Sequence, residues 1–216
     1  MSFILDTIFP VCCSACDQKG QYLCKKCQSL LIEKGIEPNF SPLFEGALSL
    51  YKYQYPINRL IHDLKYNYIT DLVDFLSTLI TNQIKLNYPH LLQYWRQEKF
   101  IFLAVPLHLF RQNWRGFNQS QLLVKKIATN LKIRYLDNLL IRSRYRKAQA
   151  SFKHRSRRFD NLINAFSLNK KTTHLLKNSN FIIFDDVITT GSTLKNIAKT
   201  LKTAKVKSLW AFSVAT

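Results

Sequence analysis

Continuous apolar runs mark the predicted strands of this chain. Residues 100–105 and 181–184 carry only apolar side chains, which is typical of short strands buried on both faces. Three further segments, rich in Tyr, Leu, Phe and Val, predict strands at residues 48–55, 135–140 and 208–214. The apolar pattern therefore predicts five strands distributed along the chain.

Between these strands, apolar residues recur at the spacing of a helix. This pattern covers residues 57–64, 72–86, 122–131 and 194–204, whereas residues 87–99 predict a loop with some helical content. Strands that alternate with helices indicate an α/β fold with a mainly parallel sheet and flanking helices. In such a sheet the ligand-binding loops follow the carboxyl ends of the strands.

One segment combines a strand, an acidic pair and a polar loop before a helix. The strand at 181–184 is followed by Asp185 and Asp186, and the loop consists of Thr189, Thr190, Gly191, Ser192 and Thr193. Unpaired N–H groups at a helix start, together with a close-approaching glycine, can bind a phosphate monoester. Two carboxylates suit a vicinal diol, so the segment predicts a ribose 5-phosphate site. The alternative is an ordinary buried strand followed by a capped helix.

All five cysteines lie between residues 12 and 27. Cys13 and Cys16 form one C-x-x-C pair, and Cys24 and Cys27 form a second. Four thiolates at this spacing can close a tetrahedral Zn²⁺ site, which has a structural role because no coordination position remains open. Cys12 could replace Cys13 in the site. Redox-active or merely buried cysteines are the alternative to a metal.

Positive charge is concentrated in the second half of the chain. The formal net charge is +19; residues 1–100 hold ten Lys/Arg and nine Asp/Glu, whereas residues 101–216 hold 22 and four. Residues 142–158 carry eight of these basic side chains and no acid, which predicts a loop that moves until an anion binds. The asymmetry favours nucleic acid as a partner, then acidic lipid; a generally basic proteome or solubility is the alternative.

The chain contains no run of 18 apolar residues, and its first residues lack the basic and apolar regions of a signal peptide. We therefore expect a cytoplasmic protein without stable membrane insertion. Two prolines in residues 37–42 are typical of a linker. This predicts an N-terminal zinc-binding module with its linker at residues 1–42 and an α/β domain at residues 43–216.

The acidic pair and the loop resemble the ligand-binding signature of the type I phosphoribosyltransferases, and the whole chain resembles the ComF (ComFC-like) family of natural-competence proteins. The matching positions are the two Cys pairs after Phe9-Pro10, Leu64-Lys65-Tyr66, Val105-Pro106-Leu107-His108, Arg111, Arg115-Gly-Phe-Asn-Gln119, Gln149, Arg157, Asn161, Ala165-Phe166 and the ribose-phosphate segment. The chain departs from the family pattern at Arg146 and at residues 202–205.

The resemblance implies a type I phosphoribosyltransferase-like fold that binds phosphoribosyl pyrophosphate (PRPP) with Mg²⁺. Asp185 and Asp186 would contact the ribose hydroxyls and are the candidate catalytic residues, and the loop would hold the 5′-phosphate. His108, Arg111 and Arg115 would face the pyrophosphate. The family also implies that the protein handles incoming single-stranded DNA beside a competence helicase, with recruitment to the inner face of the membrane as a further option.

Three functions remain open at this point. The chain is either a PRPP-fold module that acts on single-stranded DNA, an active phosphoribosyltransferase for a base, an amine or a DNA end, or a zinc-dependent adaptor with a vestigial nucleotide site. For the first, exposed aromatic residues could stack on bases. The candidates for stacking are Tyr51, Tyr53, Tyr55, Trp114 and Phe117.

Overall fold

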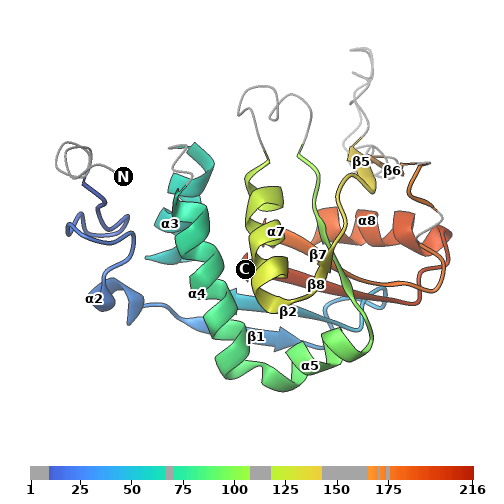
Figure 1. Cartoon of the computed structure of the whole chain (residues 1–216), viewed down its shortest axis with the longest axis horizontal. Helices are drawn as coiled ribbons and strands as arrows, with labels where there is room; N and C mark the ends of the chain where they lie inside the picture. The colour runs from blue at the N-terminus through green and yellow to red at the C-terminus, as the bar shows by residue number, and fades with distance from the viewer. Residues whose placement is uncertain (1–9, 67–70, 108–117, 143–164, 170, 174–175) are drawn as a thin grey trace, which may run out of the picture.

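A six-stranded sheet forms the centre of the molecule in a computed structural model (Figure 1). The structure describes residues 10–66, 71–107, 118–142, 165–169, 171–173 and 176–216. The strand order is β1-β2-β8-β7-β3-β4; β1 is antiparallel to β2, and the other neighbours are parallel. The strands are β1 (Glu33–Glu37), β2 (Gly46–Tyr51), β3 (Ile101–Ala104), β4 (Arg134–Tyr135), β7 (Asn180–Val187) and β8 (Ser208–Ala215).

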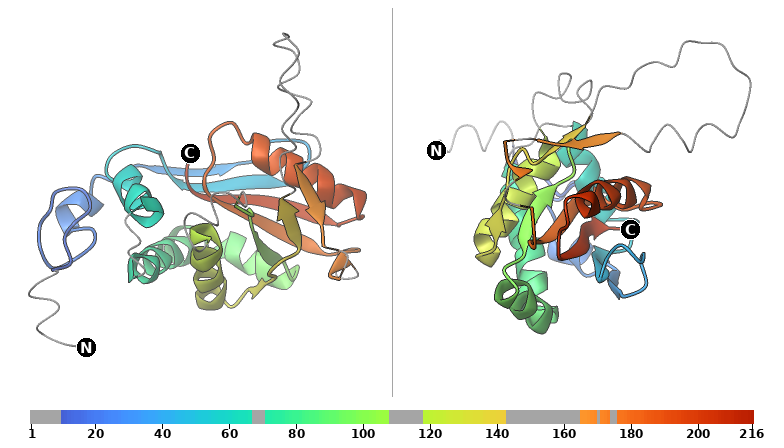
Figure 2. Two further views of the ribbon diagram at one scale, coloured as in Figure 1. Left: turned by 90° about the horizontal axis from the view of Figure 1, so that it is seen from above. Right: turned by 90° about the vertical axis from the view of Figure 1, so that its right-hand side faces the viewer.

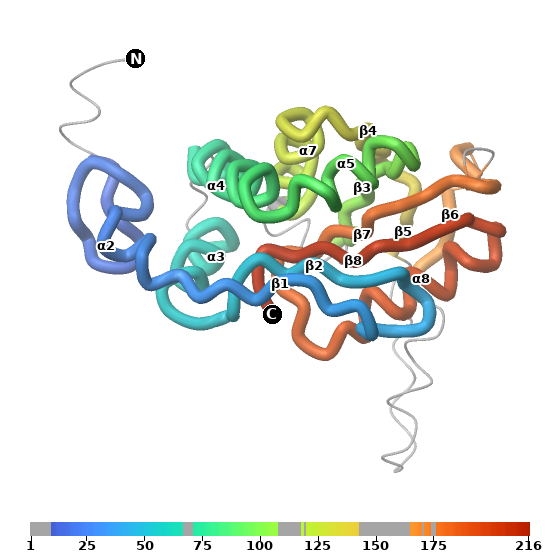
Figure 3. Tube along the Cα trace, turned by 90° about the horizontal axis from the view of Figure 1, so that it is seen from below, coloured from blue at the N-terminus to red at the C-terminus, as the bar shows by residue number. Residues whose placement is uncertain are grey.

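Helices cover both faces of this sheet. Figure 3 shows α4, α5 and α7 on one face and α8 on the other, and a short antiparallel pair, β5 (Leu140–Arg142) with β6 (Phe166–Leu168), lies on the α8 side (Figures 2 and 3). None of the helices in the described ranges has the length and apolarity needed to cross a bilayer. The helices are α2 (Lys25–Gln28), α3 (Ile57–Tyr66), α4 (Asp71–Asn87), α5 (Pro89–Gln97), α7 (Gln119–Leu131) and α8 (Ser192–Thr203).

The central strands are apolar on both faces because each face is covered. In β7, Ile182 and Phe184 pack into the core on the α4–α7 side, and Phe181 and Ile183 pack into the core on the α8 side. All four side chains are fully buried. The uninterrupted apolar run that predicted this strand is therefore a consequence of burial on both sides.

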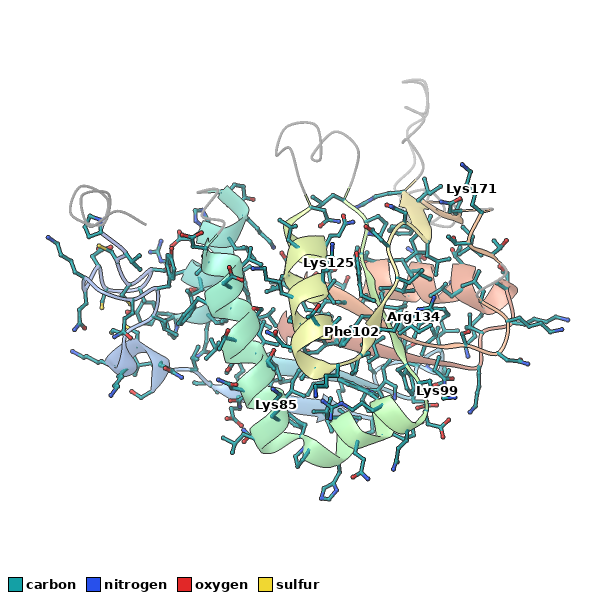
Figure 4. All side chains as sticks on the ribbon, in the orientation of Figure 1. Lys85, Lys99, Phe102, Lys125, Arg134 and Lys171 are labelled. Atoms are coloured by element: carbon teal, nitrogen blue, oxygen red, sulfur yellow. The ribbon has the colours of Figure 1, made fainter. Side chains whose placement is uncertain are left out.

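An aromatic cluster fills the core on the α4–α7 face. The Trp95 ring of α5 lies 6.2 Å from Phe102, 5.7 Å from Trp210 and 6.2 Å from Phe212, measured between centroids. Phe102 of β3 is fully buried, and Figure 4 labels it near the lower end of α7. Aromatic pairs at this separation stabilise a core beyond the contribution of their buried area, and here they attach α5 to the sheet.

The predicted fold class is confirmed, with corrections at several element ends. The strand expected at 48–55 ends at Tyr51, and the strand expected at 135–140 is two short strands, β4 and β5, separated by a turn. In the segment expected to be a loop with some helical content, residues 89–97 form a regular helix, and Pro89 occupies its first position, where no N–H is needed. Leu122, expected inside α7, is 38% exposed, and Val124 is buried in its place.

The N-terminal module lies at one end of the sheet, beside α3 and α4 (Figures 1 and 3). Its Tyr22 ring lies 5.9 Å from the ring of Phe75 on α4. The chain then continues directly into β1, an edge strand that the sequence pattern did not predict. Residues 33–37 therefore belong to the sheet although they precede the boundary expected at residue 43. The division into two domains stays a prediction.

Candidate functional site

The acidic pair lies at the carboxyl end of the central strand. The sequence predicted a strand that ends before Asp185, but β7 continues to Val187 because its neighbour β8 is equally long and pairs with it to the end. Asp185 and Asp186 therefore point to opposite sides of the strand end. Both line a cleft of about 260 Å³ at this edge of the sheet.

Backbone N–H groups and one lysine hold the two carboxylates. Asp185 Oδ1 accepts a hydrogen bond from the Asp186 N–H at 3.0 Å, and Asp186 Oδ1 accepts one from the Val187 N–H at 2.8 Å. Lys65 Nζ, near the end of α3, lies 2.8 Å from Asp186 Oδ2. Asp186 is 7% exposed, so its charge depends on this lysine for compensation.

The two carboxylates differ in their electrostatic environment. Desolvation by burial, together with the neighbouring charge of Asp186, raises the pKa of Asp185 to about 7, and the positive charge of Lys65 opposes this shift. Because Lys65 contacts Asp186 directly, the pair carries one compensated carboxylate beside one that titrates near neutrality. Such a pair can accept hydrogen bonds from a diol and can also hold a proton.

The loop before α8 has the geometry expected for binding a phosphate. Gly191 occupies the N-cap position of α8 with φ +67°, in the left-handed region that favours glycine. A Cβ at this position would approach Cζ of Phe40 to 2.6 Å. Thr190 Oγ1 accepts a hydrogen bond from the Ser192 N–H at 3.4 Å, and the side chains of Thr190 and Ser192 are both exposed. The loop therefore presents hydroxyls and helix-start N–H groups to the same edge as the carboxylates.

The structure brings together most of the predicted ligand-binding residues. Thr193 lines the cleft with the two carboxylates, and a smaller adjoining hollow of about 50 Å³ is lined by Asp185, Thr189, Gly191, Ser192 and Thr193. His108, Arg111 and Arg115 lie outside the described residues, as do residues 143–158 of the predicted basic loop.

Lys65, Ser120 and Arg142 also line the cleft, and reasoning from the residues alone did not assign them to it. The signal for Lys65 was its place in Leu64-Lys65-Tyr66, between buried Leu64 and the end of a helix. Arg142 was visible as the first residue of the basic segment. Neither pattern states which carboxylate or loop the side chain faces, since that depends on how α3 and β5 pack.

The four cysteines of the two C-x-x-C pairs form one cluster. The Sγ atoms of Cys13, Cys16, Cys24 and Cys27 all lie within 4.8 Å of one another and could hold a metal ion. The Cys16 and Cys24 sulfurs are 3.6 Å apart, close to the ~3.8 Å edge of a tetrahedron with Zn–S bonds of about 2.3 Å. The donor set and its spacing therefore fit Zn²⁺.

Hydrogen bonds hold the cluster in this arrangement. The Cys24 N–H donates to Cys13 Sγ and the Cys27 N–H donates to Cys24 Sγ, both at 3.4 Å. Cys12 lies outside the cluster, in an isolated bridge with Lys19, so the geometry favours Cys13 as the ligand. Tyr55 Oη lies 3.7 Å from Cys27 Sγ and donates to the Ala15 carbonyl at 3.1 Å.

These contacts change the set of candidate stacking residues. Tyr51 was named as a stacking candidate, with a place in the core as the alternative; it is 3% exposed and belongs to the core. Tyr55 is partly exposed, but its hydroxyl is committed to the cysteine cluster. Tyr53 remains exposed, and Trp114 and Phe117 lie outside the described part of the chain.

The chain is similar to known proteins along nearly its whole length. It is 29% identical over 216 residues to Competence protein F of Haemophilus influenzae, which covers 96% of this chain and 85% of that protein. It is 31% identical over 160 residues to DNA utilization protein YhgH of Escherichia coli O6:H1, which covers 74% of this chain and 67% of that one. The chain belongs to the ComF family. Within this ComF-family chain, residues 117–215 match the phosphoribosyl transferase domain, which includes β7, the loop and α8.

Gly191→Ala tests the loop geometry. The substitution places a Cβ against Phe40 and forces alanine into a left-handed conformation, so we expect the free energy of unfolding to fall by about 2 kcal/mol in urea titrations. Adding Phe40→Ala to both backgrounds separates the two effects. If the cost of Gly191→Ala is unchanged without the Phe40 ring, the close contact does not contribute.

Asp185→Asn tests the raised pKa. An unfolded chain releases the Asp proton above about pH 3.9, whereas the folded protein retains it up to about pH 7. The folded state therefore binds more protons in this window, and the free energy of unfolding falls as pH rises from 4 to 7. We expect Asp185→Asn to flatten this decline, and Glu37→Gln, at an exposed position of β1, to leave it as in the native chain.

Cysteine substitutions test the metal cluster. Native protein should carry one tightly bound metal ion per chain, measured by elemental analysis after dialysis. We expect Cys24→Ser to lose the ion and to lower the melting temperature, because three sulfurs hold the metal more weakly than four. Cys12→Ser is the matched control and should retain the full metal content. If Cys12→Ser loses the metal and Cys13→Ser retains it, Cys12 is the ligand and Cys13 is not.

Proposed function

We propose that this ComF-family chain acts in natural competence, where it binds incoming single-stranded DNA and a ribose 5-phosphate ligand such as PRPP. The observation that carries the proposal is the convergence of Asp185, Asp186 and the Gly191 loop on one cleft at the carboxyl edge of the sheet. The names of its relatives, Competence protein F and DNA utilization protein YhgH, support the cellular role.

In this proposal each part of the site has a separate task. The carboxylates accept hydrogen bonds from the ribose 2- and 3-hydroxyls, and the loop donates to the 5′-phosphate. Lys65, released from Asp186 or shared with it, balances the negative charge that the ligand brings. Mg²⁺ would arrive with the diphosphate, since it binds proteins through one or two carboxylates together with substrate phosphates.

Single-stranded DNA is proposed from charge. The excess of 18 positive charges in residues 101–216 favours a polyanion, and counterion release would make its binding strongly salt-dependent. We place this activity in the cytoplasm, with a separate competence helicase to supply force and with recruitment to the inner face of the membrane where DNA enters. The cysteine cluster would bind Zn²⁺ as a structural element of the N-terminal module.

A phosphoribosyl transfer reaction is the second candidate, and the Asp185 environment favours it. An amine that attacks C1 of the ribose displaces pyrophosphate and must lose a proton. A carboxylate whose pKa is raised to about 7 is suited to accept that proton near neutral pH. Asp186, paired with Lys65, would stabilise the positive charge that develops at C1.

Calorimetric titration of the zinc-replete protein with PRPP and Mg²⁺, with and without an unstructured oligonucleotide, tests both candidates. We expect PRPP to bind, and Asp185→Asn with Asp186→Asn to abolish this binding while DNA binding survives. The matched control, Glu37→Gln with Asp74→Asn, removes the same charge from exposed positions and should bind PRPP normally. Failure of native protein to bind PRPP would refute the ribose-phosphate assignment, and release of pyrophosphate in the presence of DNA would favour the transferase.

A further inference from the structure

A second cavity lies at the edge of the sheet opposite to the ribose-phosphate cleft. Its volume is about 660 Å³. The loops that precede the parallel strands surround it, since its lining includes Ile101 at the start of β3, Arg134 at the start of β4 and Asn180 at the start of β7. Ligands of open α/β sheets bind at the carboxyl ends of strands, so this cavity is separate from the candidate site described above.

The lining of this cavity is strongly basic. Five basic side chains and one acidic side chain contribute to it: Arg96, Lys99, Lys132, Arg134, Lys207 and Glu98. We call this set the basic cavity. Figure 4 shows Lys99 and Arg134 on the side of the molecule where α5 ends.

Three of its cations are available to a ligand. Glu98 is paired with Lys207 at 2.7 Å, and Arg96 donates through Nε and Nη2 to the Leu131 carbonyl at 2.9 and 2.7 Å. Lys99, Lys132 and Arg134 have no ion-pair partner among the described residues. The nearby Glu45 is exposed and does not line the cavity, and its carboxylate accepts hydrogen bonds from Tyr94, Trp210 and Ser208. The basic cavity therefore carries positive charge that the fold does not neutralise.

Three lysines at this edge of the sheet have a left-handed backbone conformation. Lys99 follows α5 with φ +54°, Lys132 follows α7 with φ +52°, and Lys205 follows α8 with φ +57°. A left-handed residue at a helix end is usually glycine, which has no steric cost there. Each of these three helices thus ends near a lysine at a position where glycine would be easier to accommodate. Lys205 adjoins the basic cavity, since its carbonyl accepts from the N–H of Asn178, which lines it.

We propose that the basic cavity and Lys205 bind the phosphate backbone of single-stranded DNA. This inference rests on the proposed function and adds the location of the strand. The site is recessed, and its lining includes none of the large apolar side chains that are exposed among the described residues. It therefore fits a polyanion better than a lipid surface, where apolar anchors would insert. α8 is 12 residues long, about 18 Å, and it separates the two edges. A bound strand would therefore leave the ribose-phosphate cleft free.

The left-handed lysines allow a test that removes charge without straining the fold. Lys99→Gly with Lys132→Gly and Lys205→Gly deletes three positive charges at positions that glycine prefers, so the melting temperature should stay the same or rise. The matched control removes three exposed lysines elsewhere, Lys34→Gln, Lys52→Gln and Lys85→Gln. Affinity for fluorescently labelled oligo(dT) is measured by anisotropy across a salt series, together with PRPP binding.

For the glycine variant we expect an affinity loss of about tenfold or more at low salt, and a salt slope smaller by about two units, since each contacted phosphate contributes about 0.7. PRPP binding should be unchanged. In the control, the salt slope should fall by less than about half of the decrease seen in the glycine variant. If the two variants show the same DNA affinity and salt slope, the basic cavity is not the DNA-binding site, and the proposed function is unaffected. Failure of native protein to bind oligo(dT) overturns both. Retained DNA binding with lost binding to phosphatidylserine vesicles would assign the cavity to membranes instead.

Discussion

Burial of β7 and β8 on both faces is the constraint on which the rest of the molecule depends. These strands lie in the middle of the sheet, pair with each other along their whole length and place bulky side chains into both cores. The ladder between β3 and β7 ends at Phe184, but Asp185 and Val187 still pair with β8, which holds the end of β7 in place where the sheet meets solvent. Two carboxylates can be kept next to each other there, despite their mutual repulsion, since the strand cannot move to separate them.

The same rigidity accounts for the asymmetry within the acidic pair. Alternation along β7 turns adjacent side chains to opposite sides, so that Asp186 meets Lys65 on α3 while Asp185 meets the loop before α8. One carboxylate is thus compensated by a side chain from the first half of the chain, and the other depends on whatever enters the cleft. The different environments of the two carboxylates follow from strand geometry, since both residues are aspartate.

Sequence reasoning located the parts of the site whose signal is local. The apolar run at 181–184, the acidic pair, the Gly191 loop and the two cysteine pairs are contiguous patterns, and each depends mainly on neighbours along the chain. The partner of Asp186 could not be predicted in this way, because Lys65 is 121 residues away in sequence (186 − 65) and reaches the carboxylate only through the packing of α3. β1 was missed for a similar reason: its side chains are mostly exposed, so edge pairing with β2 leaves no apolar pattern. The exposure of Leu122 and the burial of Tyr51 were likewise decided by neighbouring elements rather than by residue type.

Helix α3 connects the cysteine cluster to the acidic pair through contacts at its two ends. Tyr55, two residues before the helix, contacts Cys27 and the Ala15 carbonyl of the cysteine cluster, and Lys65, its penultimate residue, contacts Asp186. Ten residues of helix span about 15 Å, so the N-terminal module and the acidic pair share one rigid connector. The cysteine cluster is therefore connected through α3 to the lysine that pairs with Asp186, although 38 residues of sequence (65 − 27) separate Cys27 from Lys65.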